Sequence, residues 1–240
     1  MGVIHNMNTR SKKRKVAKKG NHYKRLKIAK AQRYKTAGKS YFDKGDYNKA
    51  IELDPRSATS YNQRGFAYKE KGEYYKALKD YDKAIELDPK CAEFYNNRAS
   101  IYKEMWSPGS SIKNYNKAIE LAPKNAIFYA NRGFFYYERR KYDKAMEDYD
   151  KAIELNPKNA IFYTTRGDIY YRKDNYDKAI EDCNMAIELD PKATASYTLR
   201  GRSYLKKVNC DKAIEDFTKA IKLKPKHANF YNNRGTAYFR

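Results

Sequence analysis

The sequence lacks long apolar runs. Only 38 of its 240 residues are Leu, Ile, Val or Phe, and no segment approaches the roughly 20 consecutive apolar residues of a membrane-spanning helix. The first residues also lack the apolar core of a secretory signal peptide. We therefore predict a soluble, cytoplasmic chain. So few apolar residues with a net charge of +23 are by themselves typical of a disordered protein.

Cysteine and histidine are scarce as well. The three cysteines and three histidines are too scattered for a disulfide framework, a metal site or a catalytic triad. No glycine-rich loop follows a predicted strand, because the sequence predicts no strands. We therefore predict no enzymatic activity, no metal and no cofactor, and a reducing compartment.

A 34-residue period is present and overrules the composition. Self-similarity at this length indicates stacked helical hairpins, in which each unit buries its apolar face against its neighbours. Tyrosine, with 25 residues, takes the place of leucine, because its ring is buried while its hydroxyl reaches a polar partner. The five full copies are residues 58–91, 92–125, 126–159, 160–193 and 194–227.

Each copy predicts two helices. In the first full copy, Tyr61, Gly65 and Tyr68 are spaced to lie on one helix face. A second face has alanines seven residues apart around Tyr81, and Pro89 ends that helix. The small residues are expected where the two helices cross, with the tyrosines filling the space around them. Cys183, at the repeat position of Tyr81, is expected to be a small core residue.

This order of aromatic, small residue, aromatic, two alanines and a final proline resembles the tetratricopeptide repeat. The resemblance covers residues 31–240 and implies an all-α, right-handed superhelical solenoid of helix-turn-helix hairpins. Residues 31–57 form a shortened repeat whose second helix loses seven residues, and 228–240 form a half repeat. That half repeat is expected to be the weakest part, with Phe230 and Phe239 facing outward. It suggests a truncated member of a longer repeat family or end-to-end self-association.

Residues 1–30 differ in kind, with 11 Lys or Arg and no Asp or Glu. We predict a flexible basic arm. Within it, Lys12, Lys13, Arg14 and Lys15 resemble a short nuclear import signal. The alternative is a general polyanion-binding arm for RNA, ribosomes or anionic lipid.

An arginine directly precedes the small residue of every first helix. It would either read an anionic ligand or pair with a recurring Asp or Glu, and we favour the pairing because a residue needed by the fold returns in every copy. The six arginines are Arg64, Arg98, Arg132, Arg166, Arg200 and Arg234.

The family resemblance implies a concave groove, lined by the first helices, that holds a partner peptide. Residues that vary between copies are the candidates for recognition, through amide and aromatic contacts. The alternative is that some of the rings pack between hairpins. The carboxylate clamp of one family subclass is incomplete in this chain. The candidate groove residues are Asn97, Asn131, Phe134, Tyr137, Asp168, Tyr171 and Arg202.

The copy at 92–125 is irregular around Trp106 and Pro108, where we predict a local bend or slack joint and a buried Trp106. Taken together, the sequence predicts a non-enzymatic scaffold that binds a protein or peptide partner. One alternative is an RNA- or polyanion-binding protein that uses the basic arm and the array, whose tyrosines could stack on bases. Another is a translocated or nuclear-directed adaptor, located in the nucleus or in a host cell.

Overall fold

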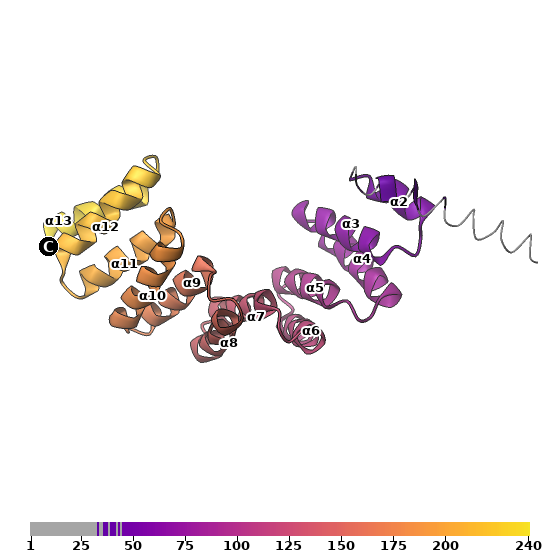
Figure 1. Cartoon of the computed structure of the whole chain (residues 1–240), viewed down its shortest axis with the longest axis horizontal. Helices are drawn as coiled ribbons and strands as arrows, with labels where there is room; N and C mark the ends of the chain where they lie inside the picture. Colours follow the sequence, from indigo (N-terminus) through magenta and orange to yellow (C-terminus); the bar gives the residue numbers. More distant parts are fainter. Residues whose placement is uncertain (1–32, 34–35, 38, 42, 44) are drawn as a thin grey trace, which may run out of the picture. The chain divides into compact units, whose positions relative to one another are not determined.

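The computed structural model describes residues 33, 36, 37, 39–41, 43 and 45–240. Within them, all regular secondary structure is helical (Figure 1), which confirms the predicted all-α class of tandem hairpins. The helices are α2 (Tyr47–Leu53), α3 (Ala58–Glu70), α4 (Tyr74–Leu87), α5 (Ala92–Glu104), α6 (Pro108–Leu121), α7 (Ala126–Glu138), α8 (Tyr142–Leu155), α9 (Ala160–Arg172), α10 (Tyr176–Leu189), α11 (Thr194–Lys206), α12 (Cys210–Leu223) and α13 (Ala228–Phe239).

Odd-numbered helices from α3 onward are the first helices of the copies, and even-numbered helices are the second helices. The second helix α2 has 7 residues where α4, α6, α8, α10 and α12 have 14, as the shortened repeat predicts. The chain divides into two compact units, 1–101 and 102–240, with the boundary inside α5. No described helix is long and apolar enough to span a membrane.

The turn between the two helices of a copy requires a left-handed residue. Gly72 has φ +74°, and Trp106, one period later, has φ +54°. The next residue donates its N–H back to the first helix, as Ser107 N does to Tyr102 O at 2.8 Å, so an αL residue closes the helix. Arg140, Asp174 and Val208 share this conformation at the same repeat position.

This turn corrects the prediction for Trp106. The side chain is 86% exposed rather than buried. Because Trp106 occupies the left-handed turn position, its side chain leaves the helix surface and does not cover the joint. Pro108, in contrast, is the first residue of α6, where a proline is tolerated as predicted.

The core of a hairpin is a close crossing between a small residue of the first helix and the residue at the Tyr81 position of the second, which is a ring in most copies. A Cβ built on Gly65 would lie 3.0 Å from Tyr81 Cε1, so glycine is needed for this approach. Tyr81 is fully buried, and Cys183 at the same repeat position is buried too, as predicted. Cys183 is smaller than a ring, and here a side chain of the next copy comes close instead: a Cβ built on Gly167 would lie 3.5 Å from Leu199 Cδ2.

Packing between successive copies uses residues that the tyrosine pattern does not reveal. Phe162 on α9 packs against Tyr149 of the preceding second helix, with ring centroids 6.5 Å apart. Phe230 on α13 is only 6% exposed and contacts Ala220, so the expectation that it faces outward is wrong. Phe239 does face outward, at 94% exposure.

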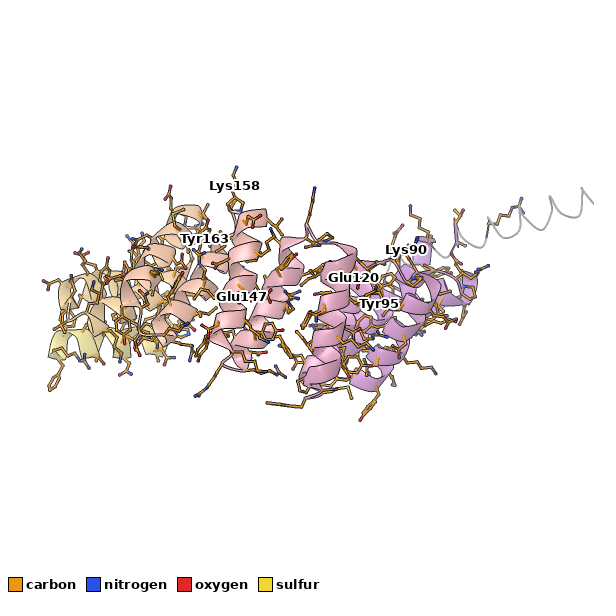
Figure 2. The ribbon with its side chains drawn as sticks, turned by 90° about the horizontal axis from the view of Figure 1, so that it is seen from below. Lys90, Tyr95, Glu120, Glu147, Lys158 and Tyr163 are labelled. Carbon is orange, nitrogen blue, oxygen red and sulfur yellow. The ribbon has the colours of Figure 1, made fainter. Side chains whose placement is uncertain are left out.

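A tyrosine three residues before the recurring arginine contacts the loop that precedes its first helix in several copies. Figure 2 labels Tyr95 and Tyr163, on the first helices α5 and α9. The Tyr95 hydroxyl donates to Pro89 O at 3.2 Å, and the Arg98 guanidinium lies 5.6 Å from its ring centroid. The hydroxyls of Tyr95, Tyr129 and Tyr197 therefore join a first helix to the loop before it, whereas Tyr231 of α13 is 44% exposed.

Candidate functional site

The recurring arginines form an internal ladder. Arg166 donates through Nε and Nη2 to the two carboxylate oxygens of Asp182, at 2.9 and 2.7 Å. Its Nη1 donates to Asp150 of the preceding copy at 2.7 Å. Each arginine in this geometry joins its own second helix to the previous one. The two-oxygen contact recurs as Arg64 with Asp80, Arg132 with Asp148 and Arg200 with Asp216.

The ladder is buried on its acidic side, which confirms the structural interpretation of these arginines. Burial raises the pKa of Asp182, while the Arg166 guanidinium opposes that rise. The hydrogen bonds to Asp182 raise the pKa of Arg166 in turn. Arg98, whose copy has Asn114 in place of the aspartate, bonds Asp82 of the preceding copy at 2.6 Å.

A second recurring contact joins the first helices to each other, between residues 31 positions apart. Tyr137 of α7 donates its hydroxyl to Asp168 of α9. The residues that make this contact differ from copy to copy. Lys103 Nζ lies 5.2 Å from the Phe134 ring centroid, and the Arg202 guanidinium lies 4.5 Å from the Tyr171 ring centroid. We call Lys103, Phe134, Tyr137, Asp168, Tyr171, Arg172 and Arg202 the groove row.

The centre of the groove row is aromatic and hydrogen-bonded. Phe134 is 40% exposed and stacks on Tyr137, with centroids 5.9 Å apart and planes inclined by 25°. Arg172 Nε donates to the Tyr137 hydroxyl at 2.8 Å and to Asp168 Oδ2 at 2.9 Å. Burial, and then the hydrogen bond to Asp168, raise the pKa of Tyr137 to about 12. The Phe134 ring thus stacks on Tyr137, whose hydroxyl is held in place by hydrogen bonds with Asp168 and Arg172.

Ion pairs fix the cation at one end of the row. Lys103 Nζ lies 3.2 Å from a carboxylate oxygen of Glu104 and 3.2 Å from one of Glu138. Lys103 and Arg172 stand at groove-facing positions of their repeats, although the seven candidate groove residues do not include them. Lys103 contacts Phe134, 31 residues away, and Arg172 contacts Tyr137, 35 residues away. Neither spacing equals the repeat period of 34, so a search for residues one period apart does not find these pairs.

The structure brings most of the predicted groove residues together, but not all. Tyr137 stacks on Phe134 and donates a hydrogen bond to Asp168. Separately, Arg202 lies over the ring of Tyr171. Asn131 is half-buried on the same helix as Phe134.

The other predicted residues are not part of this row. Asn97 lies in the first unit, and its amide donates to Asn62 at 3.0 Å and accepts from Asn96 at 3.4 Å, so this amide already has protein partners. Lys12, Lys13, Arg14 and Lys15 lie outside the described residues.

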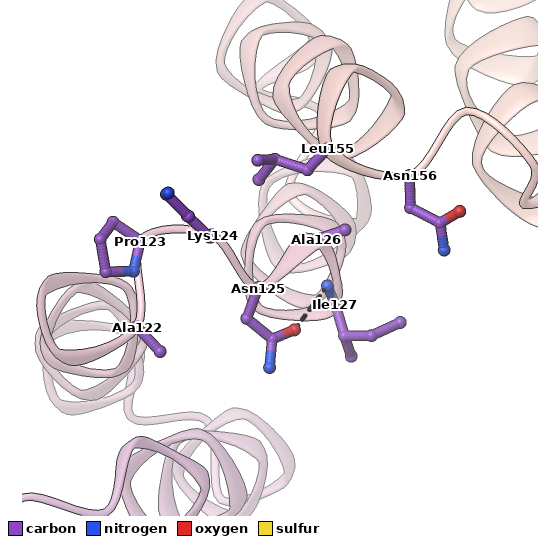
Figure 3. Close-up of a pocket in the computed structure, with 8 residues that line it drawn as sticks. All are labelled: Ala122, Pro123, Lys124, Asn125, Ala126, Ile127, Leu155 and Asn156. Atoms are coloured by element: carbon purple, nitrogen blue, oxygen red, sulfur yellow. Dashed lines mark hydrogen bonds between the residues drawn. The ribbon is translucent and has the colours of Figure 1, made fainter.

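A hollow of about 660 Å³ lies where α6, α7 and the end of α8 approach one another (Figure 3). Asn125 caps α7 there by accepting from Ile127 N at 3.0 Å. Its lining residues include one charged side chain, Lys124, and no acid or nucleophile. In the described part of the chain, no cluster of His, Cys, Asp and Glu could hold a metal ion.

Comparisons with known proteins agree with this architecture. Family models described as tetratricopeptide repeat match residues 58–91, 92–125, 114–147 and 160–193. A model described as TPR repeat matches residues 38–72, 135–174 and 209–240. A search of curated protein sequences found no match.

Similar solved structures include those of YrrB, MamA and PilF. YrrB, described as a TPR protein with an unusual peptide-binding site, is 24% identical with a TM-score of 0.61, over 79% of this chain and 97% of its own. MamA is 27% identical with a TM-score of 0.61, over 69% and 96%. PilF of Pseudomonas aeruginosa is 20% identical with a TM-score of 0.70, over 87% and 98%. With models of one repeat matching copy after copy between residues 38 and 240, the chain belongs to the tetratricopeptide repeat family.

Proposed function

We propose that this chain is a non-enzymatic scaffold that binds a segment of a partner protein on the groove row. The observation that carries the proposal is the contrast between the two recurring contacts. The arginine ladder repeats the same chemistry, as the fold requires. The contact between successive first helices has different chemistry in each copy. It joins Lys103 to Phe134, then Tyr137 to Asp168, and then Tyr171 to Arg202.

The groove row also has the chemistry of a peptide site. Rigid rings give contact area at little cost in side-chain entropy, and the polar groups between them can pair with a peptide backbone. Phe134 offers an exposed ring whose support is held by Tyr137, Asp168 and Arg172, so it is pre-organised for contact.

A display library of random peptides, selected on the immobilised full-length chain, supplies a ligand for the test. Phe134→Ala should weaken the selected peptide by about 30-fold, because truncating a central aromatic anchor costs about 2 kcal/mol. Calorimetric titration measures the affinity, and circular dichroism should show unchanged helix content.

The matched control is Phe66→Ala, at the same repeat position in α3 and 46% exposed. It should leave the affinity within about two-fold of that of the unsubstituted chain. Equal losses from both substitutions, or none from Phe134→Ala, would contradict a site on the central first helices.

Binding of nucleic acid or another polyanion through residues 1–30 remains a prediction, as does an import signal at Lys12–Lys15. One lysine on each of three second helices is paired within its own helix, which leaves that lysine less available to phosphate. Lys83 lies 2.7 Å from Glu86, Lys117 2.6 Å from Glu120 and Lys151 2.7 Å from Glu154. Loss of RNA co-sedimentation after deletion of residues 1–30 would support the arm alternative.

A further inference from the structure

The charges along the groove row are balanced at one end and unbalanced at the other. Lys103 is neutralised by Glu104 and Glu138, and Arg172 is neutralised by Asp168. Arg202 has no ion pair or hydrogen bond with any described residue, and its one described contact is with the face of Tyr171. This end of the groove row therefore carries uncompensated positive charge.

The surroundings of Arg202 strengthen this imbalance. Lys206 follows one helical turn later on α11 and also has no ion pair among the described residues, and its side chain is exposed. The carboxylate of Asp168 on α9 already accepts from Tyr137 and Arg172. Two cations on α11 thus share this end of the row, and the acid of the row is already paired.

Stacking on Tyr171 prepares Arg202 for an anion. With its guanidinium carbon 4.5 Å from the ring centroid, Arg202 is half-buried and held against the ring face. The edge of a guanidinium carries N–H donors in a fork that matches the two oxygens of a carboxylate or the oxygens of a phosphoryl group. A stacked arginine loses less side-chain entropy when it binds.

We propose that Tyr171, Arg202 and Lys206 form an anion subsite that reads an acidic group in the bound partner segment. This subsite rests on the proposed function, because it belongs to the same groove row. Adjacent packed helices lie about 8–10 Å apart, so Phe134 on α7 and Arg202 on α11 are separated by about 16–20 Å. An extended peptide spans that in about five or six residues. The partner segment carries an apolar or aromatic residue at one end of this interval and an acidic group at the other.

The selection of peptides on the full-length chain tests this directly. Peptides selected by the unsubstituted chain should combine an apolar residue with Asp or Glu about five or six positions away. The same selection on Arg202→Gln should keep the apolar residue and lose the acid, and Arg202→Glu should favour Lys or Arg there. Lys222→Gln, which removes a cation from α12, is the matched control and should select the same acidic peptides.

Synthetic peptides then separate the sources of the anion. Variants with Glu, phosphoserine or Gln at the acidic position, each with a free or amidated C-terminus, are compared by fluorescence anisotropy. The Glu and phosphoserine peptides should bind about ten-fold more tightly than the Gln peptide, and this preference should vanish in Arg202→Gln. A preference that follows the free C-terminus instead would assign the subsite to a terminal carboxylate.

The outcomes distinguish this inference from the function on which it rests. Selected peptides that lose affinity with Phe134→Ala but show no acidic preference, or the same preference in Arg202→Gln, would overturn the anion subsite and leave the groove intact. Peptides that bind independently of Phe134 would overturn both.

Discussion

At the scale of single residues, the same side chain serves different purposes in neighbouring places. Arg166 and Arg202 are both half-buried arginines on first helices. Arg166 pairs with Asp182 and Asp150, so it belongs to the fold. Arg202 meets only the Tyr171 ring among the described residues, so it is free to act on a ligand. The interaction partners of an arginine, rather than its residue type, therefore indicate whether it stabilises the fold or is available to a ligand.

The arginine ladder predicts a large difference between two arginines at one repeat position. Arg166→Ala leaves Asp182 buried without its partner and should lower the free energy of unfolding by about 3 kcal/mol. Arg234→Ala, which removes an exposed 3.3 Å bond to Thr218 and a contact with the half-exposed Tyr231 ring but leaves no buried acid unpaired, should change it by less than about 0.5 kcal/mol. Urea unfolding followed by circular dichroism measures both, and similar losses would contradict the ladder.

The environment of Tyr137 predicts a titration at high pH. Its pKa is raised to about 12, so the protonated hydroxyl that bonds Asp168 persists in the folded state after an unfolded tyrosine has ionised near pH 10. The stability from this raised pKa is therefore full below about pH 10 and is lost as pH rises through about 12. The difference in phenolate absorbance between the unsubstituted chain and Tyr137→Phe should have its midpoint near pH 12. A midpoint near 10 would mean that Tyr137 is solvated.

At the scale of helices, close crossings decide which substitutions the hairpins accept. A Cβ on Gly201 would lie 2.8 Å from Cε1 of the fully buried Phe217, whereas one on Gly235 of α13 would meet nothing within 4 Å. Gly201→Ala should therefore cost about 1–3 kcal/mol through overpacking. Gly235→Ala should gain up to about 1 kcal/mol in helix propensity. Thermal unfolding of the two variants checks the opposite signs, and a loss in both would show that α13 is covered.

The sequence predicts contacts within a hairpin better than contacts between hairpins. Gly65 and Tyr81 follow from the spacing inside one copy, because two helices joined by a short turn must cross closely. Phe230 and Tyr231 are consecutive residues of α13, and the spacing within one copy does not decide which of the two is buried against the preceding copy. The partners of Lys103 and Arg172 could not be predicted, because they lie 31 and 35 residues away, at an offset set by how the copies stack.

At the scale of the whole molecule, stability is local, because each copy contacts mainly its neighbours. Helix α13 has a neighbour on one side only in this chain, and it leaves Tyr238 and Phe239 exposed. Hydrogen exchange should show α13 opening well before α9, which packs between α8 and α10 in the same unit. Protection of α13 equal to that of α9, in dilute as well as in concentrated solution, would refute this prediction. Protection of α13 that rises with protein concentration would support end-to-end association through α13.

If a partner segment lies on the groove row, photo-cross-linking will locate a bound peptide there. A peptide selected on the full-length chain is synthesised with a photoreactive residue in place of its apolar anchor, irradiated in complex with the chain, and located by mass spectrometry. We expect cross-links on α7 near Phe134 and Tyr137, and their loss when unlabelled peptide competes. Cross-links confined to the second helices α8 and α10, or to residues 1–30, would contradict it.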